Sequence, residues 1–451
     1  MMELKHKHIV VVGLGKTGMS VARFLTARGA HVTVTDNKTR EALGNLGDEL
    51  NAMPVTAELG GHSDATLENA DLIVLSPGVP HTLPPLKRAI SRGIPVIGEI
   101  ELASRFIREP MVAVTGTNGK TTTTTLIGEI LSHSGFRVFT GGNIGTPLID
   151  YVDKGETADV LVVETSSFQL DTIDTFRPRV GVLLNITEDH LDRYDDFNAY
   201  AASKMRLFKN QIADDTAIFL GDDPRIRTLS APVSSRRQFF GGKEDSLAAA
   251  TIENRGIHFL TEENEFFLKS DALPLVGRHN MENIAAAGLA ALAAGAAEAG
   301  IRSALSRFRG LPHRIEHVDT IGRIRFYDDS KATNVDAVLR ALDAFDAPVI
   351  LILGGRDKGG DFTLLREHVT TRVKTIIALG EATPVIHSAL SGTRPIRNAA
   401  TMSDAVHLSY ELGEPGDIVL LSPGCASFDM YNNYAERGED FRRAVLKGKV
   451  T

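Results

Sequence analysis

The sequence predicts an α/β protein that is divided into three domains. Short runs of β-branched residues alternate with helical patterns along nearly the whole chain, which is typical of sheets covered by helices. The chain has 451 residues, too many for one ordinary hydrophobic core. Changes in the pattern near residues 98 and 310 give predicted domains over residues 1–98, 99–310 and 311–451.

The composition narrows the class of protein. With 43% hydrophobic and 24% charged residues, the chain is expected to be soluble and globular. A formal net charge of -8 argues against nucleic acid as the main partner. We find no apolar segment near the ~20 residues of a membrane span and no signal peptide. The one cysteine, Cys425, cannot form an internal disulfide, which favours a cytoplasmic location over a secreted enzyme without disulfides.

The first domain begins with a strand at Ile9–Val12, a helix through Arg28 and a strand at His31–Thr35. Further strands are predicted at 71–75 and 95–97. The turn Gly13-Leu-Gly15-Lys-Thr-Gly18 follows a strand and opens a helix, and Asp36 ends the next strand, which is the fingerprint of a Rossmann-like dinucleotide site. The pattern selects a diphosphate on a helix N-terminus. It therefore fits NAD in a hydride-transferring enzyme, a UDP-sugar, or a tight turn with no ligand.

The central domain contains a second glycine turn. A strand at Met111–Thr115 leads through Gly116–Gly119 into a helix at Lys120–His133. Free N–H groups at a helix N-terminus bind phosphate, Lys120 would neutralise phosphate oxygens, and the Thr121 hydroxyl could ligate magnesium. Gly116 and Gly119 bracket two residues, where the common P-loop brackets four, so we predict a variant P-loop ATPase-like domain.

Other strands of this domain are predicted at 137–140, 159–163, 180–185 and 217–220. An antiparallel insertion over 236–268 with turns at 241–242 and 254–256, and a helix at Asn283–Ala299, complete it.

Three polar residues follow these strands and are candidates for metal chemistry. Glu164 ends a buried strand near the phosphate turn, which is a natural place for a magnesium ligand; the alternative is a surface carboxylate. His190 follows another strand and could equally be a hydrogen-bonded structural histidine. Lys204 lies on a helix, where a lone lysine is usually solvated.

The third domain, also predicted to be Rossmann-like, starts near Gly310. Its strands are expected at 324–327, 349–353, 375–379 and 417–421. The segment Asp417-Ile-Val-Leu-Leu-Ser-Pro-Gly424 repeats the pattern of Asp71-Leu-Ile-Val-Leu-Ser-Pro-Gly78. Both indicate buried strands that deliver a loop at the carboxyl edge of a sheet, where ligands of α/β proteins bind.

Several segments together resemble the Mur ligases, the ATP-dependent amide ligases of peptidoglycan precursor synthesis. The resemblance spans all three predicted domains in order, through Thr115-Gly-Thr-Asn-Gly-Lys-Thr-Thr122, Glu164-Thr-Ser-Ser-Phe-Gln-Leu170, Asn185-Ile-Thr-Glu-Asp-His190-Leu-Asp-Arg193, Gly277-Arg-His-Asn-Met-Glu-Asn283, Leu311-Pro-His-Arg314, Asp329-Ser-Lys-Ala-Thr-Asn334 and Leu421-Ser-Pro-Gly-Cys-Ala-Ser427. The first domain and the last segment are most similar to the members that add D-glutamate to UDP-N-acetylmuramoyl-L-alanine.

The resemblance implies a set of roles at matching positions. The catalytic residues would be Lys120, His190 and Lys204. Two magnesium ions would be held by Thr121, Glu164, His190 and Lys204, with Lys204 carbamylated by carbon dioxide. ATP would contact Gly116, Thr117, Asn118, Gly119, Lys120, Thr121, Thr122, Thr123, Asn280, Asn283, Arg314 and Asp329, and His313 would orient a substrate.

The substrate sites follow in the same way. The UDP-sugar would contact Gly15, Lys16, Thr17, Asp36, Ser76, Gly78 and Asn143. D-glutamate would contact Lys331, Thr333, Lys358, Ser427 and Phe428, where two lysines suit a dicarboxylate.

The sequence departs from the family pattern at a few of these places. Lys16 stands where an apolar residue is common, Tyr434 where Phe is common, and Gly424 where Ala is common before Cys425. We interpret Cys425 as a small buried residue and not as a nucleophile. The expected protein is a monomer. The alternatives are a sister ligase for another amino acid, an enzyme similar to folylpolyglutamate synthase, a dehydrogenase, and a non-catalytic nucleotide switch.

Overall fold

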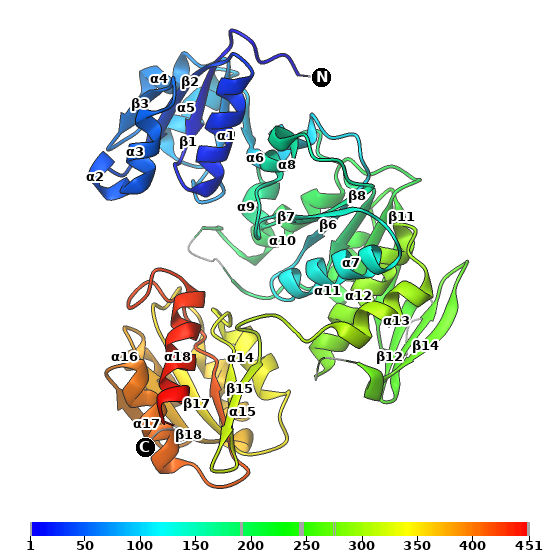
Figure 1. The fold of residues 1–451 in the computed structure, drawn as a ribbon, viewed down its shortest axis with the longest axis vertical. Helices are drawn as coiled ribbons and strands as arrows, with labels where there is room; N and C mark the ends of the chain where they lie inside the picture. The colour runs from blue at the N-terminus through cyan, green and yellow to red at the C-terminus, as the bar shows by residue number, and fades with distance from the viewer. Residues whose placement is uncertain (1, 190–192, 243–247, 274, 276, 449–451) are drawn as a thin grey trace. The chain divides into compact units, whose positions relative to one another are not determined.

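The structure, a computed structural model, contains three sheets that are mostly parallel and are flanked by helices, which confirms the three-domain α/β class (Figure 1). It describes residues 2–189, 193–242, 248–273, 275 and 277–448. The chain forms two compact units. The first contains the chain up to Ile186 with residues 198–272 and 282–306, and the second contains residues 187–197, 273–281 and the chain from 307 onward. Within the described ranges, every helix is too short or too polar to span a bilayer.

The N-terminal sheet is parallel throughout and has the strand order β3-β2-β1-β4-β5. Its strands are β1 (His8–Val12), β2 (His31–Asp36), β3 (Thr56–Leu59), β4 (Leu72–Leu75) and β5 (Val96–Gly98), and its helices are α1 (Lys16–Ala27), α2 (Arg40–Leu43), α3 (Asn45–Asn51), α4 (Asp64–Glu68) and α5 (Pro84–Ser91). Strand β3 is not among the strands that the sequence predicts. The order reverses between β1 and β4, so the loops after these two strands open a crevice at the carboxyl edge.

The second sheet has nine strands in the order β14-β13-β12-β11-β10-β9-β6-β8-β7. The strands are β6 (Met111–Thr115), β7 (Val138–Gly142), β8 (Val160–Glu164), β9 (Val180–Leu183), β10 (Thr216–Leu220), β11 (Arg236–Gly241), β12 (Ala248–Glu253), β13 (Gly256–Leu260) and β14 (Glu265–Lys269). Strand β6 lies between β8 and β9, and both of these neighbours are parallel to it. Runs of Val, Leu and Ile in parallel strands of this sheet are buried on both faces, and they form its core.

The helices of this part are α6 (Glu99–Ser104), α7 (Lys120–His133), α8 (Leu148–Lys154), α9 (Ser167–Leu170), α10 (Phe197–Met205), α11 (Pro224–Ser230), α12 (Arg278–Ala293) and α13 (Glu298–Arg307), with short 3-10 turns at Arg206–Phe208 and Ser270–Ala272. The predicted helix at Asn283–Ala299 is wrong in its bounds. It starts earlier as α12 and stops before Gly295, whose positive φ of 98° ends it, so that α13 is separate.

The predicted antiparallel insertion over 236–268 is only partly correct. Strand β11 is parallel to β10, and β12 is parallel to β11, so both extend the main sheet. The antiparallel part is limited to β12, β13 and β14, and the expected turn at Asn254-Arg255 joins β12 to β13. Alternating hydrophobicity cannot tell a half-exposed parallel edge from an antiparallel hairpin, which explains the error.

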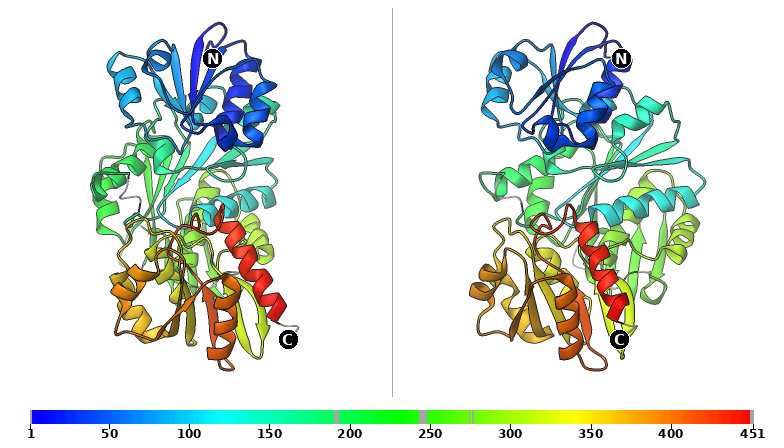
Figure 2. Two further views of the ribbon diagram at one scale, coloured as in Figure 1. Left: turned by 90° about the vertical axis from the view of Figure 1, so that its left-hand side faces the viewer. Right: turned by 60° about the vertical axis from the view of Figure 1, so that its left-hand side comes forward.

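The C-terminal sheet has the order β15-β16-β20-β17-β18-β19 and is parallel except for β15. The strands are β15 (Glu316–Ile321), β16 (Ile324–Asp328), β17 (Val349–Gly354), β18 (Val373–Leu379), β19 (Ile396–Ala399) and β20 (Ile418–Leu421), and the helices are α14 (Val335–Leu342), α15 (Arg366–Arg372), α16 (Thr383–Leu390), α17 (Met402–Leu412) and α18 (Tyr434–Gly448), with a 3-10 turn at Phe362–Leu365. Strands β15 and β19 are not among the strands that the sequence predicts. Alternate residues of β17 pack into two cores, one under α14, α15 and α16 and the other under α17 and α18, which lie side by side (Figure 2).

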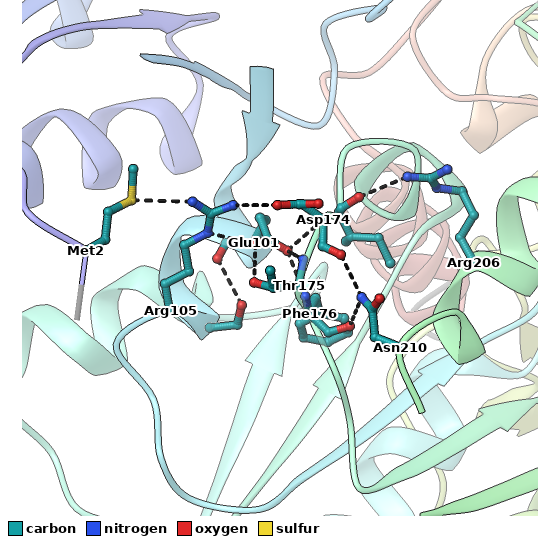
Figure 3. A network of polar contacts seen from close by, with 10 residues as sticks. Met2, Glu101, Arg105, Asp174, Thr175, Phe176, Arg206 and Asn210 are labelled. Atoms are coloured by element: carbon teal, nitrogen blue, oxygen red, sulfur yellow. Dashed lines mark hydrogen bonds and ion pairs between the residues drawn. The ribbon is translucent and has the colours of Figure 1, made fainter. Parts of the chain in front are cut away.

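A buried carboxylate fastens α6 to the loop that follows α9. Glu101 is 0% exposed, and its Oε2 accepts hydrogen bonds from the backbone N–H groups of Asp174, Thr175 and Phe176 at 2.9, 3.0 and 2.8 Å (Figure 3). Its Oε1 accepts from the Thr175 hydroxyl and from Arg105 Nε. Burial acts against this charge, but the hydrogen bonds outweigh it and lower the pKa of Glu101. The charged carboxylate therefore stabilises the junction between the first two sheets.

Glu99, two residues earlier, has its pKa shifted in the opposite direction. It is 1% exposed, its Oε1 accepts from the Ile149 backbone N–H at 2.7 Å, and its Oε2 is buried with no hydrogen-bond partner in the described part of the chain. Burial raises the pKa of Glu99 to about 7.

We predict that Glu99→Gln changes the pH dependence of stability. Because the folded-state pKa lies above the ordinary 4.5, the folded protein binds more protons, and stability falls as pH rises from about 4.5 to about 7. Relative to wild type, the Gln variant should gain up to about 3 kcal/mol over this range. Chemical denaturation at several pH values measures it, with the exposed Glu156→Gln as the control. Parallel pH profiles for all three proteins would contradict the prediction.

Candidate active site

The phosphate turn lies between β6 and α7, with the bounds that the sequence predicted. Gly116 has a φ of 154°, and Gly119 has a φ of 85° and caps α7. A Cβ at Gly119 would lie 2.2 Å from Asn283 Oδ1, and one at Gly116 would lie 3.0 Å from Leu184 Cβ. Both positions therefore require glycine, because a side chain would be strained and would collide with α12 or with the end of β9. Thr122 and Thr123 are buried at the start of α7.

Asn185 shapes this turn, a role that the sequence does not predict. Its Oδ1 accepts from the Asn118 backbone N–H at 2.8 Å, its Nδ2 donates to the Asn118 carbonyl at 3.0 Å, and its own carbonyl accepts from the Thr117 N–H at 3.0 Å. Tyr200 adds a hydroxyl contact of 3.1 Å to the Thr117 hydroxyl. The turn is thus held in shape before any ligand binds, which reduces the entropy lost on binding.

Two lysines from different helices converge on the Gly116 carbonyl oxygen. Lys120 Nζ donates to this oxygen at 2.9 Å and to the Thr117 carbonyl at 2.8 Å. Lys204 Nζ donates to the same oxygen at 2.8 Å, is 1% exposed and lies 4.5 Å from the centre of the Tyr200 ring. Lys204 is therefore buried against the phosphate turn, and its interpretation as a solvated surface residue is wrong.

Glu164 ends β8 next to β6 and is a candidate metal ligand. It is 2% exposed, and its Oε1 accepts from Asn143 Nδ2 at 2.8 Å. Its Oε2 is buried and lacks a hydrogen-bond partner among the residues that the structure describes. A buried carboxylate oxygen at the edge that carries the phosphate turn is the kind of donor that Mg²⁺ prefers, so the residues present fit this ion. The alternative of a surface carboxylate is wrong.

A cavity of about 790 Å³ opens at the carboxyl edge of the first sheet. Its lining includes all seven residues expected to contact the UDP-sugar, Gly15, Lys16, Thr17, Asp36, Ser76, Gly78 and Asn143. Three other lining residues come from the part of the chain that forms the second sheet: Gly142 ends β7, Asn143 follows it, and Gln169 lies on α9. His62, Asn37 and Lys38 also line it and were not anticipated, because no local motif marks them.

The glycines and polar groups of this cavity explain its shape. A Cβ at Gly18 would lie 1.9 Å from the Gly13 carbonyl, whereas one at Gly15 would meet nothing within 4 Å, so Gly15 faces open space. Asp36 accepts from the backbone N–H groups of Leu14 and Lys38 at 2.6 and 2.8 Å and so fixes the loop after β1. Lys16 Nζ donates to the Gly145 carbonyl at 2.6 Å.

The second compact unit holds the remaining expected ATP residues. Asp329 is 7% exposed, accepts from the Ser422 hydroxyl at 2.8 Å, and has its pKa raised to about 7 by burial. His313 has a φ of 62°, and its hydrogen bond of 2.7 Å to Asp328 raises its pKa. Arg314 is half-buried, as is Asn280 at the start of α12. Residue His190 lies outside the described residues.

The expected amino-acid residues follow three strands of the C-terminal sheet. Lys331 Nζ lies 2.9 Å from the Tyr434 hydroxyl, which accepts its hydrogen bond, so the unusual hydroxyl at 434 has a partner. Lys358 Nζ lies 3.4 Å from Asp189 Oδ1, and Asn334 Nδ2 donates to Asp189 Oδ2 at 3.1 Å, so Asp189 is a further polar group of this site. Ser427 is buried, Thr333 is half-buried and Phe428 is 63% exposed. Cys425 is 0% exposed, and burial raises its pKa to about 12, which supports its interpretation as a packing residue.

The fold and these residues define a class of protein. A glycine turn after an inner parallel strand, with a buried carboxylate on the next strand of the sheet, is typical of proteins that bind nucleoside triphosphate with magnesium. The cavity of the first sheet lies at its switch point, the place where open α/β sheets commonly bind nucleotides.

The chain belongs to the Mur ligase family. Family models described as "Mur ligase MurD-like, N-terminal domain", "Mur ligase middle domain" and "Mur ligase, glutamate ligase domain" match residues 7–98, 114–291 and 313–425. A UDP-N-acetylmuramoylalanine–D-glutamate ligase from Desulfosudis oleivorans is 52% identical over 99% of this chain and 98% of its own length. One from Desulfatibacillum aliphaticivorans is 51% identical over 98% of this chain and 99% of its own.

A solved structure with the same fold is the MurF ligase from Thermotoga maritima in complex with ADP. It has a TM-score of 0.62 at 18% identity and covers 99% of this chain and 96% of its own. At this identity the likeness supports the fold alone.

We predict that Gly119→Ala weakens ATP binding by at least about tenfold, because the new methyl group collides with Asn283 and moves the turn. The control is Gly135→Ala at the other end of α7. Gly135 also has a positive φ, of 92°, but its Cβ would meet nothing within 4 Å. Both variants carry the strain of a left-handed alanine, about 1 kcal/mol, and only the first should lose affinity in calorimetric titration with ATP. Equal dissociation constants for the two would contradict the role of the turn.

Proposed function

We propose that this protein joins D-glutamate to UDP-N-acetylmuramoyl-L-alanine through an amide bond, using ATP and Mg²⁺, in peptidoglycan precursor synthesis. The observation that carries the proposal is the hydrogen bond of 2.8 Å between Asn143, which lines the cavity of the first sheet, and Glu164, beside the phosphate turn. A nucleotide-sugar in that cavity would extend its far end toward the triphosphate. The names of the relatives with about half identical residues supply the two substrates.

The residues of the turn would bind the triphosphate of ATP. The backbone of Gly116–Gly119 and the start of α7 favour negative charge, and Lys120 and Thr121 to Thr123 would contact the phosphates. In the second unit, Asn280, Arg314 and Asp329 would bind the nucleoside end, and Asn283 of α12 would lie beside the turn. Lys120 would neutralise charge that develops on the oxygens of the transferred group.

The reaction would proceed in two steps with all atoms accounted for. The alanyl carboxylate oxygen attacks the γ-phosphorus, the bond to the bridging oxygen breaks, and an acyl phosphate and ADP result. The amine of D-glutamate then attacks the acyl carbon, loses a proton and expels inorganic phosphate. Water must be excluded while the acyl phosphate exists, since hydrolysis would waste it.

Magnesium would be held by Thr121 and Glu164 at one site and by His190 and Lys204 at a second. When bound, it would screen charge on the phosphate oxygens. The orphaned Oε2 of Glu164 supports the first site.

We further propose that Lys204 becomes carbamylated. Its ammonium group would first lose a proton, and the neutral amine would then attack carbon dioxide and release a second proton, so that a cation becomes a carboxylate-like anion. Two observations support this step. Lys204 is 1% exposed, and its Nζ and that of Lys120 lie 2.8 and 2.9 Å from the same oxygen. Two ammonium groups less than about 6 Å apart repel each other, whereas a carbamate would attract Lys120 and a cation.

D-glutamate would be bound by Lys331, Thr333, Lys358, Ser427 and Phe428. The two lysines would pair with its two carboxylates. Lys358 now pairs with Asp189 at 3.4 Å, so the substrate would have to compete with or extend this contact.

We also propose domain limits at 98/99 and 310/311, a monomeric enzyme and a cytoplasmic location. The buried single cysteine is consistent with a reducing compartment.

We predict phosphate release that depends on all three substrates. The purified protein with ATP, Mg²⁺ and UDP-N-acetylmuramoyl-L-alanine should release phosphate when D-glutamate is added, and not with L-glutamate or a diamino acid. A coupled phosphate assay measures the rates. Turnover with a different amino acid would make the chain a sister ligase, and hydride transfer to NAD would favour the dehydrogenase.

We predict that Lys204→Ala loses at least about a hundredfold of kcat. If the carbamate acts as an anion, a short-chain carboxylate added to the assay should restore part of the rate by filling the space. The control is Lys209→Ala, which removes an exposed lysine just after α10 and should leave kcat unchanged. A loss that no carboxylate restores, with ATP affinity also unchanged, would contradict the carbamate.

A further inference from the structure

A buried arginine of helix α18 contacts the loops of the expected amino-acid site. Arg437 is 2% exposed, and its guanidinium donates to four oxygens. Nε reaches the Ser330 hydroxyl at 2.9 Å, and Nη2 reaches the carbonyls of Ser330 and Cys425 at 2.8 and 3.1 Å. Nη1 reaches the Ala426 carbonyl at 3.3 Å.

These partners are neutral, which is unusual for a buried guanidinium. Among the described residues, no carboxylate forms an ion pair with Arg437, although Asp328 and Asp429 add a weaker attraction from a distance. Burial lowers the pKa of Arg437 to about 10, so the group stays charged at neutral pH. A buried charge without an ion-pair partner costs several kcal/mol, which a purely structural cross-link between loops could avoid.

The oxygens bound by Arg437 belong to the loops that carry the expected D-glutamate contacts. Ser330 directly precedes Lys331, and Ala426 directly precedes Ser427. The Ala426 carbonyl also accepts from the backbone N–H of Arg356, and Ala426 donates to the Arg356 carbonyl, at 2.9 and 3.0 Å. This bridge attaches the loop after β17, which carries Lys358. Arg437 thus joins three loops that start from β16, β17 and β20.

The contact between Arg437 and the Ala426 carbonyl also fixes the orientation of the peptide group between Ala426 and Ser427. All peptide bonds of the described chain are trans, so each carbonyl and the N–H of the next residue point in opposite directions. With the Ala426 carbonyl directed at Arg437, the Ser427 N–H is directed away from it. Arg437 therefore fixes which side of the loop presents its N–H group. Gly355 makes room for the guanidinium, since a Cβ there would lie 3.0 Å from Nη1.

We propose that Arg437 is a positioning residue for the amino-acid substrate. It holds the loops of Lys331, Lys358 and Ser427 in one arrangement, and its charge stabilises the two carboxylates of a dicarboxylic amino acid that binds above these loops. The inference rests on the proposed assignment of the amino-acid site. It predicts that the affinity for D-glutamate depends on Arg437, whereas the affinities for ATP and the UDP-sugar do not.

The test compares Arg437→Met, Arg437→Lys and Arg443→Met. Arg443 lies on the same helix, is exposed and pairs with Asp440, so it is a matched control. Arg437→Met should raise the KM for D-glutamate at least about tenfold and leave the KM for ATP within about twofold. Arg437→Lys, which keeps the charge and loses the fork, should recover part of the affinity, and Arg443→Met should match wild type. An unchanged KM for D-glutamate, or an equal rise in all KM values, would overturn the proposal.

A second variant covers the case in which Arg437→Met does not fold. Ser330→Ala removes the hydroxyl that accepts from Nε and leaves the charge in place. It should raise the KM for D-glutamate by about threefold with little change in Tm. An unchanged KM in this variant would also overturn the inference. If wild type shows no turnover with D-glutamate at all, the proposed function fails, which is a different result from normal turnover with an indifferent Arg437.

Discussion

The arrangement of the proposed nucleotide site depends on one oxygen atom, the carbonyl of Gly116. The ammonium groups of Lys120 and Lys204 donate to it from different helices at 2.9 and 2.8 Å. Gly116 and Gly119 have no side chains, so α12 and the residue that follows β9 pack closely against the turn. The start of α7 and the ammonium group of Lys120 favour negative charge at this turn, and Lys204 is buried against the same oxygen.

The order of the strands places two further polar residues at the edge of the sheet where that oxygen lies. Because β8 and β9 flank β6 and run parallel to it, Glu164 and Asn185 are delivered to the same edge as the turn. Glu164 offers a buried oxygen that has no hydrogen-bond partner among the described residues, and Asn185 holds the turn in shape. In the C-terminal sheet the loops after β16, β17 and β20 meet at Arg437 in the same manner. Parallel strands thus bring residues far apart in the sequence to one place without any long-range motif.

Much of this could be predicted from the sequence, and the failures have physical causes. Strand β6, the phosphate turn and α7 were predicted to the residue, because glycine spacing and an apolar run mark them. Strand β11 was misassigned because its alternating pattern also fits a hairpin. The sequence marked Lys204 only by resemblance, since burial of a lysine depends on tertiary packing. Asn185, Asp189 and Arg437 were missed as site residues because each acts through backbone or neighbouring side chains, which leaves no local signal.

In the proposed reaction, ATP at the phosphate turn transfers its γ-phosphoryl group to the carboxylate of the ligand in the cavity of the first sheet. The most direct measurement uses UDP-N-acetylmuramoyl-L-alanine labelled with oxygen-18 in the alanyl carboxylate, together with ATP and D-glutamate. Attack of that carboxylate on the γ-phosphorus moves a carboxylate oxygen into the phosphate that is released later. We predict that mass spectrometry finds oxygen-18 in inorganic phosphate in proportion to the amide formed. Unlabelled phosphate formed at the same rate as the amide would contradict the account.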